Sequence, residues 1–322
     1  MEMKKLIAVG IILLFIGTTI IPSNGQDTSK SSSPTSRGNT LYVGGSGPGN
    51  YTTIKDAVDN ATDGDTVFVY SGFYNESRIC LNNSIIVLGE NKNTTIIDGR
   101  GYSYIFCLKE SCEISGFTFQ NSKIGIDVES NQNNVVHDNI IRNTTDSGIL
   151  LIYSNYNVIF ENIVYNNNGG IALLHSFYNI IQGNILTNNT DGIYADFVYN
   201  NSIIQNSIKN STEHGIYVVD SFKMFIHDNE IIQNNIGIDL TYSGLTIITK
   251  NNIYHNKKNA GFYGPIPNLN VWARNYWGLR LLPIKIIKGV GAIFKFNQFP
   301  PQEITFPWLD FDLFPRWRPY NI

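Results

Sequence analysis

Residues 148–193 read GILLIYSNYNVIFENIVYNNNGGIALLHSFYNIIQGNILTNNTDGI, and this stretch contains the dipeptide Gly-Ile three times. The dipeptide recurs on both sides of this stretch, and the glycines of the whole series are Gly125, Gly148, Gly170, Gly192, Gly215 and Gly237. The successive spacings are 23, 22, 22, 23 and 22 residues. A constant period of this length is typical of a repeat architecture.

A second marker keeps the same period. An asparagine lies 14 residues after each of these glycines, at Asn139, Asn162, Asn184, Asn206, Asn229 and Asn251. Between the markers, short apolar runs such as Val158-Ile159 and Ile163-Val164 alternate with Asn, Gly, Ser and Thr, which indicates strands and turns. About 22 residues cannot hold a crossover helix, and the leucine spacing of leucine-rich repeats is absent.

Successive strands must therefore stack directly as coils, with each residue about 4.8 Å from its counterpart in the next coil. Because right-handed crossovers are strongly preferred, the sequence predicts an all-β fold, a single-stranded right-handed parallel β-helix. We expect the six asparagines to form a structural ladder at a bend, in which each side-chain amide donates to the next asparagine. Gly116 is expected in the same column one coil earlier, where it would tolerate a positive φ.

The domain organisation follows from composition. Lys4 and Lys5 precede an apolar run from Leu6 to Ile21, so residues 1–25 are predicted to be a secretory signal peptide. The alternative is an uncleaved membrane anchor, although the run of 16 residues is shorter than the roughly 20 that a spanning helix needs. Residues 26–39 are Ser/Thr-rich and are expected to be a flexible leader.

Residues 40–256 are predicted to form the β-helix with its N-terminal cap. The cap includes a short helix that opens at Thr53 and a first strand over residues 64–69. Repetition stops near Lys257, and all four tryptophans and eight of the eleven prolines follow it. Residues 257–322 are therefore expected to be an irregular, aromatic-rich C-terminal cap, because both ends of a solenoid need covering.

The net charge is −3, from 23 basic and 26 acidic residues, so no electrostatic footprint points to nucleic acid as a partner. The three cysteines Cys80, Cys107 and Cys112 leave at least one thiol without an intramolecular partner. Two alternatives stay open: a Cys107–Cys112 bridge across a turn, or small side chains buried in strands. Nine Asn-x-Ser/Thr sequons, Asn143 among them, are potential glycosylation sites.

At both ends of the repeats the sequence resembles a known family. Tyr51-Thr52-Thr53-Ile54, Gly64-Asp65-Thr66-Val67 and Ile96-Ile97-Asp98-Gly99 near the front, and Asn275-Tyr276-Trp277-Gly278 near the back, are similar to the pectin lyase-like right-handed β-helix superfamily. Within it the chain resembles the exported NosD-type repeat proteins of archaea and bacteria. Members include polysaccharide lyases, hydrolases, carbohydrate-binding surface proteins and an accessory protein of copper-enzyme maturation, so the resemblance implies the fold more specifically than the function.

The polygalacturonase set of the family's enzymes, Asn-Thr-Asp followed by Asp-Asp and Gly-His-Gly, is not complete in this sequence. Asp-Asp and Gly-His-Gly do not occur, and His214-Gly215 is preceded by Glu213. A copper site needs converging Met, Cys or His ligands. His137 and His227 share a column but lie four coils apart, roughly 19 Å at the strand spacing. We therefore expect no metal site and no cofactor.

Aligning the coils by their glycines places one polar cluster together. Asp191 and His214 fall in the same column of adjacent coils, about 5 Å apart, with Glu213 beside them. These three are the candidate catalytic acid/base residues. The candidate substrate-binding residues around them are Tyr194, Asp196, Tyr217, Asp220 and Asp239.

Three interpretations of this cluster stay open: catalysis, glycan binding without turnover, and an inert solvated wall. A second carboxylate pair, Asp138 and Glu161, has the spacing of retaining glycosidases but no accompanying aromatic residue in its column. The sequence as a whole favours a secreted or cell-surface protein that interacts with polysaccharide or cell envelope. A lyase or glycoside hydrolase and a purely structural surface element are the alternatives. A membrane is expected as a partner only through an uncleaved signal segment.

Overall fold

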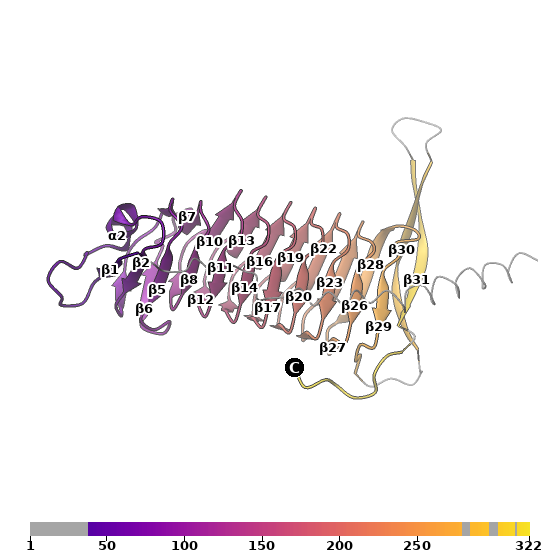
Figure 1. The fold of residues 1–322 in the computed structure, drawn as a ribbon. Helices are drawn as coiled ribbons and strands as arrows, with labels where there is room; N and C mark the ends of the chain where they lie inside the picture. Colours follow the sequence, from indigo (N-terminus) through magenta and orange to yellow (C-terminus); the bar gives the residue numbers. More distant parts are fainter. Residues whose placement is uncertain (1–37, 279–283, 296–301, 313) are drawn as a thin grey trace, which may run out of the picture. The chain divides into compact units, whose positions relative to one another are not determined.

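The computed structural model describes residues 38–278, 284–295, 302–312 and 314–322. In these residues the chain forms a right-handed parallel β-helix with one short α-helix (Figure 1). The predicted signal peptide and residues 26–37 of the predicted leader lie outside the described residues. Among the helical residues that are described, no segment is long and apolar enough to cross a membrane.

Each regular coil contributes three strands, and equivalent strands of successive coils pair in parallel to form three walls. Wall 1 consists of β4 (Ile79–Leu81), β7 (Tyr104–Leu108), β10 (Ile124–Glu129), β13 (Ser147–Ile152), β16 (Gly169–Leu174), β19 (Asp191–Asp196), β22 (His214–Val219), β25 (Ile236–Thr241) and β28 (Lys258–Pro265). Wall 2 consists of β1 (Thr40–Val43), β2 (Thr66–Val69), β5 (Ile86–Gly89), β8 (Glu113–Ser115), β11 (Val135–His137), β14 (Val158–Phe160), β17 (Ile180–Gln182), β20 (Ser202–Ile204), β23 (Phe225–His227), β26 (Ile247–Thr249) and β29 (Val271–Ala273). Wall 3 consists of β3 (Gly72–Tyr74), β6 (Thr95–Asp98), β9 (Thr118–Gln120), β12 (Ile140–Arg142), β15 (Ile163–Tyr165), β18 (Ile185–Thr187), β21 (Ser207–Lys209), β24 (Glu230–Ile232) and β27 (Asn252–Tyr254).

The Gly-Ile repeat has a direct structural reason. The isoleucines that follow the glycines pair in register along wall 1, and Ile171, Ile193 and Ile216 are fully buried in the core. A Cβ added to Gly170 would lie 2.4 Å from the carbonyl oxygen of Gly192, which is backbone and cannot move aside. Glycine therefore permits the close stacking of coils, and isoleucine fills the interior behind it.

The asparagine ladder lies at the corner between walls 2 and 3. Asn184 donates to the Oδ1 of Asn206 at 3.0 Å, and Asn206 donates in the same way to Asn229. Each side-chain oxygen also accepts the backbone N–H of the preceding asparagine, as in the 2.9 Å bond from the Asn184 N–H to Asn206. All six predicted ladder residues are fully buried. The ladder thus satisfies backbone and side-chain groups at a corner that water does not reach.

One column assignment from the sequence is wrong. Ile140 pairs with Thr118, so Phe117 rather than Gly116 lies beside Asn139. Gly116 lies in the adjacent column next to Asp138, and both residues have a positive φ, 84° and 50°. The 23-residue spacing of the glycines in wall 1 does not hold at this corner, where the two coils are offset by 22 residues.

The N-terminal cap contains one strand more than the sequence predicts. The strand β1 begins at Thr40 and pairs with β2, whereas the sequence places the first strand at residues 64–69. The helix α2 (Ile54–Asn60) lies at this end of the coils (Figure 1), and it buries Ile54, Ala57 and Val58. The Thr53 side chain accepts the Asp56 N–H, as expected for a helix N-cap.

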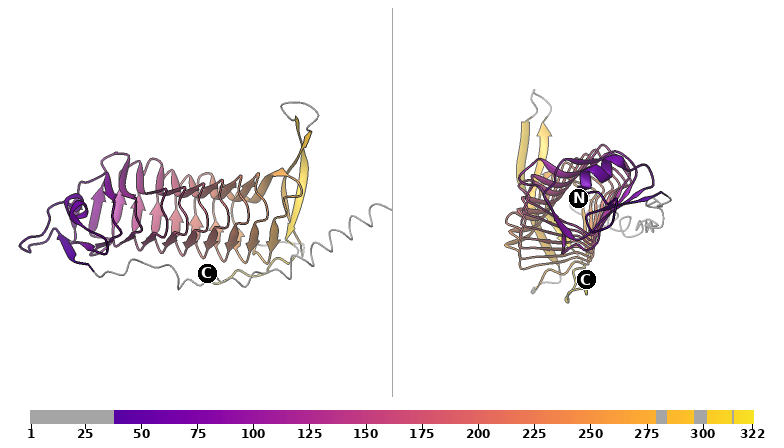
Figure 2. Two further views of the ribbon diagram at one scale, coloured as in Figure 1. Left: turned by 45° about the horizontal axis from the view of Figure 1, so that its top comes forward. Right: turned by 90° about the vertical axis from the view of Figure 1, so that its left-hand side faces the viewer.

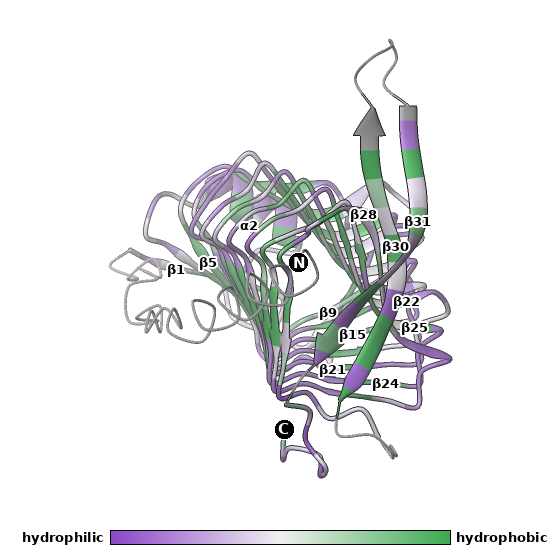
Figure 3. Ribbon diagram, turned by 90° about the vertical axis from the view of Figure 1, so that its right-hand side faces the viewer, coloured by the Kyte–Doolittle hydropathy of each residue, from purple (hydrophilic) through white to green (hydrophobic). Residues whose placement is uncertain are grey.

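At the C-terminal end the coils continue past residue 256, through β28 and β29. An antiparallel hairpin of β30 (Lys285–Lys295) and β31 (Gln302–Asp312) follows. Strand β30 pairs with β28, and the two views of Figure 2 show the hairpin crossing this end of the coils and extending beyond them. Figure 3, seen from the same end, shows apolar strands lining the inside of the coils.

The cysteines are free thiols. Cys112 is buried and donates to the carbonyl oxygen of Asn83, whereas Cys107 pairs in register with Cys80 on wall 1. The structure therefore has no Cys107–Cys112 bridge, and both of these side chains are buried as free thiols.

Candidate functional site

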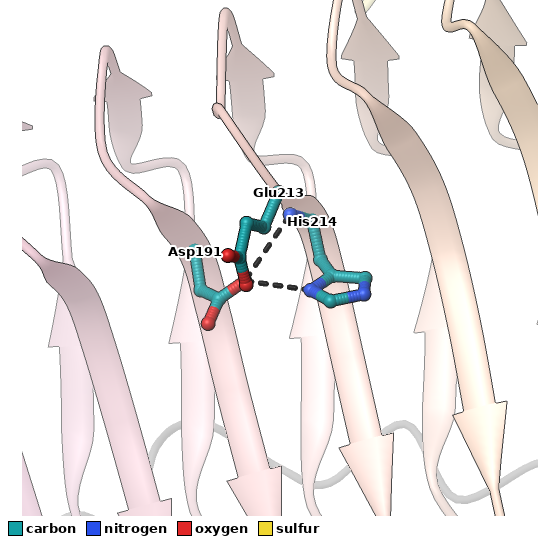
Figure 4. A group of neighbouring side chains, drawn as sticks. All are labelled: Asp191, Glu213 and His214. Carbon is teal, nitrogen blue, oxygen red and sulfur yellow. Dashed lines mark hydrogen bonds and ion pairs between the residues drawn. The ribbon is translucent and has the colours of Figure 1, made fainter.

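The candidate residues come together on the outer surface of wall 1. Strands β19, β22 and β25 are consecutive, and Asp191 pairs in register with His214. Tyr194, Tyr217 and Asp239 follow one another in a second column. Figure 4 shows the side chains of Asp191, Glu213 and His214 converging at the N-terminal ends of β19 and β22.

His214 is held by several neighbours. Its Nδ1 lies 2.8 Å from the Oδ1 of Asp191, and its backbone N–H donates to the same oxygen at 3.1 Å. Its Nε2 lies 3.9 Å from the Oδ2 of Asp239, and its ring stacks on Tyr217 with 4.3 Å between centroids. These contacts fix the imidazole between two carboxylates and an aromatic face.

The electrostatics favour the protonated form of this histidine. Burial alone would lower the pKa of His214, but the hydrogen bond to Asp191 and the charges of Asp191, Asp239 and Glu213 outweigh it and raise the pKa above its ordinary value of 6.5. The three carboxylates nevertheless outnumber the imidazolium. The cluster therefore has a negative net charge even when His214 is protonated.

We predict that Asp191→Asn lowers the pKa of His214, because it removes the carboxylate that stabilises the imidazolium. Proton NMR titration of the imidazole should show the wild-type pKa above 6.5 and a lower value in the variant. Since the folded-state pKa exceeds the unfolded one, this interaction stabilises the fold below about pH 6.5, and the contribution is lost as pH rises through the folded-state pKa. Glu161→Gln, in another part of the solenoid, is the control. A wild-type pKa at or below 6.5 would contradict the prediction.

The tyrosine positions continue the cluster along wall 1. The ring centroids of Tyr194 and Tyr217 lie 5.6 Å apart, and the Tyr194 hydroxyl donates to the Oδ2 of Asp196 at 3.0 Å. Burial and the Asp196 carboxylate raise the pKa of Tyr194, so its hydroxyl keeps its proton. Burial, together with the nearby charge of Asp196, also raises the pKa of Asp220. All five predicted binding residues are thus half-buried on one surface.

Two neighbours were missed by the sequence reasoning. A Cβ on Gly261 would meet the Nζ of Lys258 and, at 3.2 Å, the Oδ1 of Asp239, so this ammonium and this carboxylate flank the same glycine. Phe197, directly after Asp196, is 53% exposed and stacks on His175. Lys258 lies in register with His214 two coils away. Asn259 takes the place of the glycine in this coil, so alignment by glycines stops one coil before Lys258.

The other predicted groupings have different neighbours. Asp138 and Glu161 lie in consecutive coils, as their column predicts, but Asp138 forms an ion pair with Lys92. His137 and His227 are connected through Phe160, Gln182 and Ile204, which places four register steps between them. Beside the first pair, in the neighbouring column, His137 stacks on Phe160 with 4.6 Å between ring centroids. The two histidines are too far apart to bind one metal ion.

The candidate ligand groups among the described residues differ from the soft ligands that a copper ion prefers. Asp191, Glu213 and His214 have ligand atoms within 4.8 Å of one another, but they offer two carboxylates and one imidazole rather than soft ligands. Cys80 and Cys107 supply two thiols, yet burial and the neighbouring Cys80 raise the pKa of Cys107 to about 12, which opposes the metal-binding thiolate. Met224 is buried in the core. These residues do not fit a soft-ligand copper site.

Comparison with solved structures identifies the same fold elsewhere. The A-module of the Azotobacter vinelandii mannuronan C-5 epimerase AlgE6 superposes with a TM-score of 0.56 and 16% identity, over 70% of this chain and 81% of that one. A double mutant of the periplasmic alginate epimerase AlgG superposes with a TM-score of 0.53 and 16% identity, over 74% of this chain and 68% of that one. The enzymatically active domain of bacteriophage CBA120 tailspike protein 2 superposes with a TM-score of 0.54 and 13% identity, over 79% of this chain and 43% of that one. At these identities the likeness establishes the fold alone.

No curated protein matches this sequence. A family model described as "Periplasmic copper-binding protein (NosD)" matches residues 36–278, which are most of the chain and span the cap and the coils. A periplasmic family is an exported one, as the sequence predicts. This chain belongs to the NosD family of periplasmic copper-binding proteins, within the pectin lyase-like right-handed parallel β-helix fold.

Proposed function

We propose that this exported β-helix protein binds polysaccharide on wall 1, across β19, β22 and β25, at the cell surface or after secretion. The observation that carries the proposal is the His214–Tyr217 stack, 4.3 Å between centroids, flanked by Asp191 and Asp239. Aromatic faces pack against the apolar faces of sugar rings, and carboxylates accept hydrogen bonds from hydroxyl groups. Both kinds of group lie here within three consecutive coils.

The charges narrow the ligand class. Asp191, Glu213 and Asp239 surround a single histidine, and Asp196 and Asp220 follow along the same wall. Acidic sugars would be repelled by this surface, whereas hydroxyl groups and ammonium groups would be attracted. The site therefore favours neutral polysaccharides or polysaccharides that contain amino sugars.

The structural relatives support the general class of ligand. Two of them are named for their action on mannuronan or alginate, and the third is an enzymatically active phage tailspike domain. Their low identity transfers no substrate to this chain. The carboxylates around His214 favour a different sugar from the acidic polymer named for the epimerases.

Binding is tested with a glycan array that includes neutral, amino-containing and acidic polysaccharides, probed with the purified protein. We expect retention of a neutral or amino-containing glycan, with at least about tenfold weaker binding by Tyr217→Ala, because the variant removes the central ring. Tyr102→Ala, which changes an exposed tyrosine in a distant N-terminal coil, is the matched control. Absence of retention across the panel, or equal binding by Tyr217→Ala, would contradict the proposal and favour a structural surface element.

A second candidate function is acid/base catalysis at the same site. The 2.8 Å contact between Asp191 and His214 favours it, because an oriented imidazole with a raised pKa can donate a proton to a leaving group. Glu213 is the second carboxylate within reach of the pair. Turnover would appear as release of reducing or unsaturated sugars that is lost in His214→Gln, while binding persists. Retention without any release would leave binding as the function.

A further inference from the structure

A separate pocket lies where the C-terminal segment meets the coils. It has a volume of about 510 Å³ and is lined by Asp228, Lys250, Arg274, Arg316 and Tyr320. Asp228, Lys250 and Arg274 come from consecutive coils, at the corner between walls 2 and 3, and all have positive φ. Three of the five lining residues are cations, in a chain whose net charge is −3.

The backbone around the pocket is fixed by specific contacts. Asn252, which is buried, donates to the carbonyl oxygen of Tyr320 at 2.9 Å and accepts the Tyr320 N–H at 2.8 Å. The Tyr320 hydroxyl donates to the carbonyl oxygen of Arg274, and the Arg316 guanidinium lies 4.3 Å from the Tyr320 ring centroid. The arginine from the tail is thereby held beside the arginine from the coil.

The cations of the pocket lack acidic partners within the described residues. No ion pair is formed by Lys250, Arg274 or Arg316 in that part of the chain, and the one carboxylate in the lining, Asp228, lies 2.7 Å from the Nδ1 of His227. Three cations against one carboxylate leave the pocket with a net positive charge. This arrangement is electrostatically unfavourable, and a bound anion would reduce its cost.

We propose that this pocket binds an oxyanion, a carboxylate or phosphate group, through Lys250, Arg274 and Arg316. The planar arginine side chains offer paired N–H donors that match the two oxygens of such a group, and the lysine adds a point charge. The site is independent of the glycan-binding proposal. It lies at the corner between walls 2 and 3 rather than on wall 1, it uses different residues, and its charge is positive rather than negative.

The proposal is tested by calorimetric titration of the full-length protein with inorganic phosphate and, separately, with trigalacturonate, which carries carboxylates on a sugar chain. We expect at least one probe to bind, and binding to weaken about tenfold in Lys250→Gln and to fall in high salt. Among the described residues, the Lys250 side chain forms no hydrogen bond or ion pair with the tail, so this variant should stay folded. Arg274→Gln and Arg316→Gln should weaken binding at least as much, with folding checked by circular dichroism.

Lys257→Gln, which removes an equal charge outside the pocket, is the matched control and should bind like the wild type. Phosphate binding alone identifies a free oxyanion as the ligand, and trigalacturonate binding alone identifies an anion carried on a chain; both results support the pocket. Failure of both probes, or unchanged affinity in Lys250→Gln, overturns the proposal. Tyr217→Ala should leave this binding intact, which keeps the test separate from that of the glycan site.

Discussion

Asn206→Ala is expected to lower the free energy of unfolding by about 3–5 kcal/mol, because the substitution removes one complete member of a buried ladder. The Asn206 side chain donates to Asn229 Oδ1 and to the carbonyl oxygen of Ile181, and it accepts from both the backbone N–H and the side-chain amide of Asn184. All these groups are buried, so water cannot replace the lost partners. The measurement is urea unfolding followed by circular dichroism.

The control for this prediction is Asn168→Ala. Asn168 is exposed and lies at another corner of the coils, and its side chain forms no hydrogen bond within the part of the chain that the structure describes. Its substitution should change the unfolding free energy by less than about 0.5 kcal/mol. Equal effects of the two substitutions would mean that the ladder contributes no more to stability than an exposed asparagine.

The second large effect is expected at Asp312, where the asparagine ladder ends. After Asn251 the ladder continues to Asn275, and Asn275 donates to the carboxylate of Asp312, which is fully buried. One carboxylate oxygen also accepts from the Trp277 indole, and the other accepts the backbone N–H of Arg274 and of Phe314. A carboxylate suits the last position because it only accepts hydrogen bonds, and no further acceptor is needed beyond it.

Asp312→Ala should therefore destabilise the C-terminal cap by about 3–5 kcal/mol, since five donors lose their acceptor. Hydrogen exchange should accelerate first in β29 and β31. Opening of the cap exposes strand edges, so size-exclusion chromatography should also show self-association. Asp312→Asn, which keeps one acceptor oxygen, should have an intermediate effect.

Asp146→Ala is the control, because Asp146 forms an exposed ion pair with Lys123 at 3.7 Å. This substitution should cost less than about 1 kcal/mol. Protection of β29 and β31 in Asp312→Ala at the wild-type level would contradict the role of Asp312 as the end of the ladder.

The candidate site could be assembled from the sequence because a parallel β-helix converts a sequence period into a distance. Residues in the same column of adjacent coils lie about one strand spacing apart, so the sequence alone pairs Asp191 with His214. The same arithmetic separated His137 from His227. It misplaced Gly116 by one position, since the coil length changes by one residue where an insertion falls at a corner.

Other features depended on contacts that no period describes. The pocket at Lys250 brings together the coils with Arg316 and Tyr320, some 66 to 70 residues later in the chain. The terminal role of Asp312 likewise depends on how the tail folds back onto Asn275. Arg316, Tyr320 and Asp312 lie outside the repeats, so alignment by glycines could not place them.

The sequence by itself determined the coil length, the stacking of the Gly-Ile and asparagine columns and the residues that share an outward face. These follow from short-range periodicity, and each repeat faces the same steric and hydrogen-bonding requirements. Tertiary structure decided the side-chain conformation that places His214 between Asp191 and Asp239, the additional strand β1 and the docking of the C-terminal tail. Those depend on side-chain packing and on non-repeating contacts between distant segments, whose energies a repeat pattern does not encode.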